Sequence, residues 1–193
     1  MGSNRYSDKN YRRGTMNKDN LPSIEICSMW FDENFLAPYF LKHYSFADKI
    51  RVIDDEESTD NVKGIVAQYS NATLETIKFP AGFDNDIAVA KLNQCYSESK
   101  ADWFIAVDAD EFVLQDDLKK FLQHRLEDIF YARLYQVYRT TVDQDLNINL
   151  PIKEQRRYGD ADVVKGNNKA GAKPIVVRTG LRKLKWMPGQ HNI

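Results

Sequence analysis

The sequence predicts an α/β domain with a Rossmann-like, mainly parallel sheet flanked by helices. From Ile24 onward, short apolar runs alternate with longer segments whose apolar residues recur at helical spacing, and such alternation is typical of strand–helix–strand units. The fourth run, residues 103–107, is apolar throughout, as expected for a central strand buried on both faces. A chain of 193 residues has room for one domain with a real core. We therefore expect a single domain over residues 22–193.

The first half of the chain is expected to form three strand–helix pairs. Three apolar runs predict strands, at residues 24–29, 50–53 and 74–79. After each run, apolar residues three and four positions apart predict a helix, over residues 36–44, 62–69 and 87–95. Asp32–Asn34 and Asp84 precede the first and third helices, where such side chains commonly cap the first turn.

The second half predicts strands at residues 103–107, 129–138 and 173–178. A short helix through Leu118 and Leu122 is expected between the first two, opened by Asp116 or Asp117. Residues 141–172 are polar and contain one proline and three glycines, which predicts a long loop.

The composition narrows the function classes and the location. A formal net charge of -1 gives no general attraction to nucleic acid or anionic lipid. No apolar run approaches the roughly 20 residues that a transmembrane helix needs, so we expect a cytoplasmic protein, with peripheral membrane attachment as the alternative. Residues 1–21 are polar and predict a disordered tail. Cys27 and Cys95 lie in apolar segments and are expected to be buried thiols. No closing element is evident at the C-terminus, which fits truncation of the domain there.

Two acidic clusters follow predicted strands. Asp54 and Asp55 come directly after the second strand, and Asp108 and Asp110 come after the fourth. Ligands of open α/β sheets bind beyond the carboxyl ends of the strands, and carboxylates in this number suit Mg²⁺ or Mn²⁺ bridging to phosphates. A solvated loop is the alternative for either cluster alone. Their coincidence at strand ends favours a site for a nucleoside diphosphate.

Several blocks of the sequence resemble those of a known family. The matching blocks are residues 28–36 (SMWFDENFL), Asp54 and Asp55 with the following Ser-Thr-Asp, residues 103–112 (WFIAVDADEF), the strand 173–178, and His191. Together they resemble the glycosyltransferase 2-like group of GT-A enzymes, whose signature is an Asp-X-Asp motif. The resemblance covers most of residues 22–193.

The resemblance implies a nucleotide-diphosphate sugar as donor, a UDP-sugar first of all, and Mn²⁺ or Mg²⁺ as cofactor. It places Asp54 and Asp55 at the base and ribose, Asp108 near the ribose and the metal, and Asp110 on the metal.

Three further residues correspond more loosely to positions of the family. Lys91 and Asn93 lie on the helix that carries donor contacts in related enzymes, with a solvated lysine as the alternative for Lys91. His191 resembles a late histidine that ligates the metal, with an incidental histidine as the alternative. The general base of inverting members has no clear counterpart, and Asp160 and Asp162 are the nearest candidates.

The resemblance therefore implies a metal-dependent glycosyltransferase of the hexosyltransferase type, which would serve polysaccharide biosynthesis. It moves a sugar to a hydroxyl of a glycan or lipid-linked acceptor, expected to contact residues 139–172, where Arg156 and Tyr158 lie. One alternative is a non-catalytic domain that binds a nucleotide sugar without turnover. The other is a haloacid-dehalogenase-like phosphatase with Asp108 as nucleophile, although that family has its Asp-X-Asp motif after the first strand.

Overall fold

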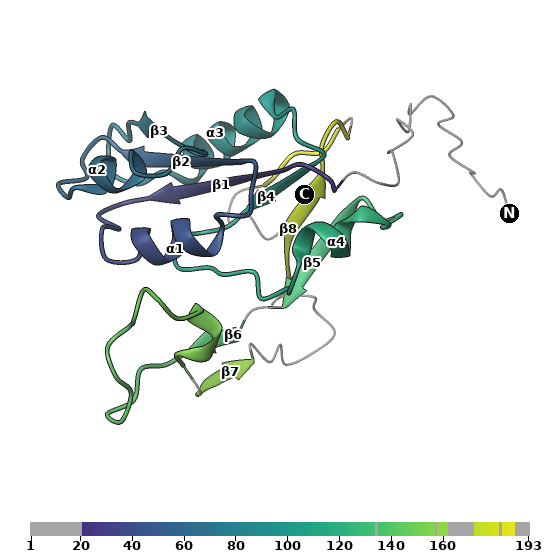
Figure 1. The fold of residues 1–193 in the computed structure, drawn as a ribbon. Helices are drawn as coiled ribbons and strands as arrows, with labels where there is room; N and C mark the ends of the chain where they lie inside the picture. The colour runs from purple at the N-terminus through teal and green to yellow at the C-terminus, as the bar shows by residue number, and fades with distance from the viewer. Residues whose placement is uncertain (1–20, 134, 157, 162–171, 182, 188–193) are drawn as a thin grey trace, which may run out of the picture.

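The structure is a computed structural model that describes residues 21–133, 135–156, 158–161, 172–181 and 183–187. Its main feature is a six-stranded sheet with the order β3-β2-β1-β4-β8-β5 (Figure 1). The strands are β1 (Ile24–Trp30), β2 (Lys49–Asp55), β3 (Ala72–Ile77), β4 (Trp103–Ala106), β5 (Ile129–Arg133) and β8 (Ala172–Arg178).

The sheet is mainly parallel. β1 pairs in parallel with both β2 and β4, and β2 pairs in parallel with β3. Only β8 runs against its neighbours in this sheet, because it is antiparallel to β4 and to β5. The predicted fold class, α/β with a mainly parallel sheet flanked by helices, is confirmed.

Helices cover both faces of the sheet, α1 and α3 from opposite sides (Figure 1). The helices are α1 (Ala37–His43), α2 (Val62–Val66), α3 (Asn85–Glu98) and α4 (Leu118–Gln123). Apolar residues of α1, α2 and α4 share one core cluster with Ile24 and Ile105 of the sheet. On the other face, α3 packs with Phe104 and with Trp186 of the C-terminal segment. Alternation along each strand thus supplies both cores.

Asp84 caps α3 as expected, since its carboxylate accepts hydrogen bonds from the backbone of Asp86 and Ile87. Asp117, one of the two candidates, caps α4. The expected cap of α1 is wrong: its N-cap is Leu36, which has no side-chain cap. Asp32 instead accepts a hydrogen bond from the backbone of Thr59, 27 residues away.

The long strand expected at residues 129–138 is divided. β5 ends at Arg133, and β6 (Tyr135–Val137) pairs with β7 (Gly159–Ala161) in a separate two-stranded sheet. The expected long loop therefore contains β7, the start of β8 and a short 3₁₀ helix, η1 (Ile152–Glu154). The sequence does not show this division, because residues 129–138 are apolar or aromatic at most positions and nothing in them marks where the partner strand changes.

The segment from 139 to 156 is held against the main domain. The Tyr39 hydroxyl and the Lys42 ammonium on α1 donate to the carbonyls of Leu146 and Ile148, at 2.9 and 2.5 Å. Lys153 also bonds to Asp116 in the loop after β4. These contacts fix the position of the segment beside α1.

Among the described helices, none combines the length and apolar character needed to cross a membrane. Cys27 on β1 and Cys95 on α3 are buried free thiols, as expected. The tail over residues 1–20, as well as Asp162 and His191, lies outside the described residues.

Candidate functional site

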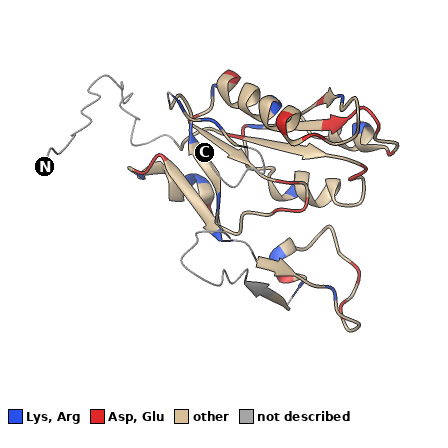
Figure 2. Cartoon of the chain, turned by 180° about the vertical axis from the view of Figure 1, so that it is seen from behind, with Lys and Arg blue, Asp and Glu red and all other residues tan. Residues whose placement is uncertain are grey.

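The carboxyl ends of β2, β1 and β4 lie side by side at one edge of the sheet. The three strands are neighbours in this order and all run in the same direction. Figure 2 shows acidic segments, in red, where these strands end. The structure thus brings Asp54 and Asp55, the last two residues of β2, and the loop with Asp108 and Asp110 to the same edge, with the loop after β1 between them.

The loops after β1 and β2 are joined by hydrogen bonds. Asp32 accepts from the Thr59 backbone at 2.7 Å, and Asp60 accepts from the Asn34 backbone at 2.7 Å. Asp32 adopts a φ of 52°, a left-handed conformation that is uncommon for residues other than glycine. The bonds to the second loop therefore hold the first loop in an unusual conformation at the edge of the sheet.

Asp54 is buried, with 8% of its surface exposed. Burial raises the pKa of its carboxyl, the hydrogen bond from the Ser58 hydroxyl at 2.8 Å partly offsets this effect, and nearby carboxylates, Asp60 first, raise it further. Asp55 is less buried and accepts a hydrogen bond from the backbone of Glu57. The end of β2 therefore concentrates negative charge that no described cation neutralises.

Asp110 is exposed, and its carboxylate lies close enough to the loop after β1 to act on Glu33. Burial raises the pKa of Glu33, in the loop after β1, and the charges of Asp110 and Asp60 raise it further. Three loops from three strands therefore place their carboxylates close enough to repel one another. Such repulsion is the condition that a bound cation relieves.

Asp108 has a cationic partner. The Lys173 ammonium on β8 lies 2.5 Å from one oxygen of Asp108 and 2.8 Å from one oxygen of Glu111. The second Glu111 oxygen accepts from the Asp108 backbone at 2.9 Å. Burial alone would lower the pKa of Lys173, but the two carboxylates outweigh it and raise the pKa above its ordinary value. Lys173, Asp108 and Glu111 form what we call the Lys173 triad.

The structure gives Lys91 and Asn93 partners within the chain. Lys91 forms an ion pair with Glu75 on β3 at 2.7 Å. Asn93 exchanges two hydrogen bonds with the backbone of Trp186. A donor contact would have to share these groups, so the donor-binding role of both residues stays a prediction. Asp160 lies in β7, where its backbone pairs with Gln136.

Sequence reasoning missed Glu33, Asp60 and Lys173 as members of this edge. The acids occur in loops where carboxylates commonly cap helices, so their residue type gave no separate signal. Lys173 offered one signal, because it stands at the start of an otherwise apolar run, KPIVV. A cation at the end of a buried strand indicates a buried anionic partner.

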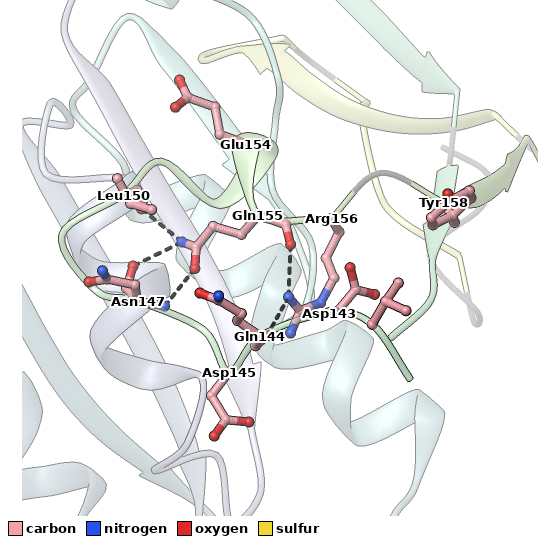
Figure 3. Close-up of a pocket in the computed structure, with 10 residues that line it drawn as sticks. Asp143, Gln144, Asp145, Asn147, Leu150, Glu154, Gln155, Arg156 and Tyr158 are labelled. Atoms are coloured by element: carbon pink, nitrogen blue, oxygen red, sulfur yellow. Dashed lines mark hydrogen bonds between the residues drawn. The ribbon is translucent and has the colours of Figure 1, made fainter. Parts of the chain in front are cut away.

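A cavity of about 470 Å³ lies in the segment that follows β6. Figure 3 shows its lining, which consists of carboxylates, amides, one arginine, one tyrosine and the two apolar residues Val142 and Leu150. The Gln155 side chain bonds to the backbone of Asn147 and Leu150, and Arg156 donates to the carbonyl of Gln144. These bonds hold the wall of the cavity in place. Tyr158, which also lines the cavity, is 58% exposed.

The donor set at the edge fits a divalent cation that is shared with a ligand. Among the described residues, no group of three or more acidic, histidine or cysteine side chains is arranged to hold a metal by itself. Mg²⁺ usually keeps waters and is held by one or two carboxylates together with substrate phosphates. Exposed Asp110 and half-exposed Asp108 meet that requirement.

Comparison with solved structures finds partial similarity. S. aureus TarS 1-349 is 17% identical to this chain, with a TM-score of 0.47, and the match covers 63% of this chain and 38% of that chain. For TarS 1-349 in complex with UDP-GlcNAc, the identity is 17% and the TM-score 0.46, and the match covers 63% of this chain and 37% of that chain. Glucosyl-3-phosphoglycerate synthase from Mycobacterium tuberculosis, in complex with Mn²⁺, UDP-glucose and phosphoglyceric acid, is 15% identical, with a TM-score of 0.36 and coverages of 46% and 34%. The chain thus spans well under two thirds of these proteins.

A comparison with curated proteins gives no match. The model of the family described as glycosyl transferase family 2 matches residues 40–176, which is more than half of the chain. This match agrees with the resemblance and leaves the haloacid-dehalogenase hypothesis without support, as does the position of Asp108 after β4 rather than after the first strand. The chain therefore belongs to glycosyl transferase family 2.

Proposed function

We propose that this chain binds a nucleotide-diphosphate sugar at the carboxyl edge of the sheet and transfers the sugar to a hydroxyl group, with Mn²⁺ or Mg²⁺ as cofactor. The observation that carries the proposal is the negative charge gathered at this edge, where the charges of Asp110 and Asp60 raise the pKa of Glu33. A protein keeps such charges together when a ligand of opposite sign compensates them.

The proposed roles of the residues are those that the resemblance to the family implies. Asp54 and Asp55, at the end of β2, bind the ribose and base of the donor. Asp108 and Asp110 hold the divalent ion as the Asp-X-Asp motif of the family, with His191 as a further ligand. Lys91 and Asn93 remain candidate donor contacts from α3. When bound, the ion stabilises negative charge on the departing diphosphate.

The reaction is a substitution at the anomeric carbon. The acceptor oxygen bonds to this carbon, the bond from the carbon to the diphosphate breaks, and the nucleoside diphosphate leaves with the electron pair. The hydroxyl proton passes to a general base, for which Asp160 and Asp162 are the candidates. A hexosyl group is the proposed sugar, and UDP is the proposed nucleotide.

The proposed acceptor is a glycan or lipid-linked saccharide that enters the cavity of the 139–158 segment (Figure 3). Planar amide and carboxylate side chains can pair with adjacent sugar hydroxyls, and the exposed Tyr158 ring offers an apolar face to a pyranose ring. A screen of saccharides by thermal shift tests this location. Stabilisation that Tyr158→Ala abolishes supports the location, whereas equal stabilisation of wild type and variant contradicts it.

A thermal-shift screen tests the donor site. UDP at about 100 times its dissociation constant should stabilise the protein by about 2.7 kcal/mol in Mn²⁺, and by far less in excess chelator, because the acidic edge then repels the diphosphate. GDP and ADP serve as matched controls for the base. Equal stabilisation by UDP with chelator would contradict a metal-bridged site. Release of UDP from a UDP-sugar in the presence of saccharides then separates a transferase from a domain that binds without turnover.

A further inference from the structure

Lys173 is a buried cation placed at the candidate metal site. Only 6% of its surface is exposed. β8 pairs with β4 so that Arg178 lies opposite Trp103 and Val176 opposite Ile105, and continuing this antiparallel register places Lys173 opposite Asp108. The strand pairing therefore determines where the ammonium lies.

The Lys173 triad uses the inward-facing oxygens of both acids. One Asp108 oxygen and one Glu111 oxygen accept from the ammonium, and the second Glu111 oxygen accepts from the Asp108 backbone. The remaining Asp108 oxygen has no hydrogen-bond partner among the described residues, and the Asp108 side chain is 47% exposed. Asp108 therefore offers a ligand one oxygen, while the other is held by the lysine.

The charges of the triad determine what can bind to that oxygen. Two carboxylates and one ammonium leave a single net negative charge, and the ammonium repels a divalent cation that approaches the carboxylate it contacts. This repulsion is strong because the lysine is buried and poorly screened. A diphosphate that binds together with the cation supplies negative charge in place of the charge that the lysine cancels, and the cation can then bind.

We infer that Lys173 is a positioning residue that partly neutralises Asp108 and Glu111 in the metal-free protein, so that a divalent cation binds tightly only together with a nucleoside diphosphate. The inference rests on the proposed function, because it assigns the order of binding at the same site. A lysine that only stabilised the fold would have no effect on the affinity for the cation.

Lys173→Met tests this inference through direct metal binding. Free Mn²⁺ is measured by electron paramagnetic resonance, with and without UDP. Without UDP, the variant should bind Mn²⁺ at least about tenfold more tightly than wild type, because the repelling charge is gone. UDP should then increase the Mn²⁺ affinity of the variant by a smaller factor than that of wild type.

Lys119→Met is the matched control, since Lys119 is also a largely buried lysine paired with a carboxylate, Asp48, at 2.8 Å. It should leave Mn²⁺ binding at the wild-type value. If Lys173→Met does not fold, the double variant Lys173→Met/Glu111→Gln also removes the carboxylate that would be left without its cation. It should show a smaller gain in the same direction, because the repelling ammonium next to Asp108 is gone but one carboxylate is gone too.

A folded single or double variant with unchanged or weaker UDP-free Mn²⁺ binding would overturn the inference. Its failure differs from failure of the proposed function, in which wild type would show no binding of UDP with Mn²⁺.

Discussion

Glu33 is the residue at which the electrostatic cost of the acidic edge is easiest to measure. Burial and the charges of Asp110 and Asp60 raise its pKa in the folded protein. A raised pKa means that the folded state binds more protons than the unfolded state, so stability falls as the pH rises. The carboxylate therefore destabilises the metal-free protein at neutral pH.

Glu33→Gln should raise the stability of the metal-free protein at pH 7 by on the order of 0.5 kcal/mol. The gain should disappear as the pH falls toward the ordinary value of 4.5, because wild type then carries a neutral carboxyl too. Urea unfolding of both proteins between pH 4 and pH 7 measures this difference. Exposed Glu57→Gln is the control, and a Glu33→Gln protein less stable than wild type at pH 7 would show that the charge is not repelled.

Among the elements, β2 carries a buried cation far from the acidic edge. Arg51 is 5% exposed and contacts Glu25 on β1, Glu75 on β3 and Glu98 on α3, at 3.0, 3.3 and 2.8 Å. One guanidinium thus ties three strands and one helix together. Glu25 is itself buried, so removal of the arginine would leave its charge with Lys49 as the one cationic partner among the described residues.

Arg51→Met should lower the free energy of unfolding by about 3 kcal/mol, because it leaves a buried carboxylate poorly compensated. Glu98→Gln should have a much smaller effect, since the Glu98 side chain is 47% exposed. Chemical denaturation of the two variants tests the comparison. If both variants lost a similar free energy of unfolding, burial of the Arg51–Glu25 pair would not explain the stability of this network.

The elements also show what a sequence can predict. The cap of α3 by Asp84 was predictable because donor and acceptor are two or three residues apart. The Asp32–Thr59 bond and the Lys173–Asp108 pair were not, because their partners meet only through strand order and register. The acidic strand ends of the site could be predicted from a local pattern. The cation that balances one of them depends on the antiparallel strand β8.

At the scale of the whole molecule, two cores on opposite faces hold the sheet in place. The loops that follow the strands form the surface at its carboxyl edge. α1, α2 and α4 cover one face, and α3 with Trp186 covers the other. The edge is thus built by rigid strands. Of the residues proposed to bind the donor and its metal ion, Asp54 and Asp55 end β2, Lys91 and Asn93 lie on α3, and Asp108 and Asp110 lie in the loop after β4, and the carboxyl ends of strands and the loops beyond them are where such folds bind ligands. The 139–158 segment, held to α1 by Tyr39 and Lys42, adds a second cavity beside this framework.

The central claim is that Asp110 and a divalent ion bind the nucleotide together, and calorimetric titration with UDP tests it most directly. In Mn²⁺, Asp110→Asn should weaken UDP binding at least about tenfold, since even the loss of an outer-shell partner of a metal commonly has an effect of this size. In excess chelator, wild type and variant should both bind UDP weakly. Without ligand, the variant should melt at the wild-type temperature or slightly above it, because Asp110 is exposed and its charge repels Glu33. A folded Asp110→Asn protein that binds UDP in Mn²⁺ with wild-type affinity would contradict the account.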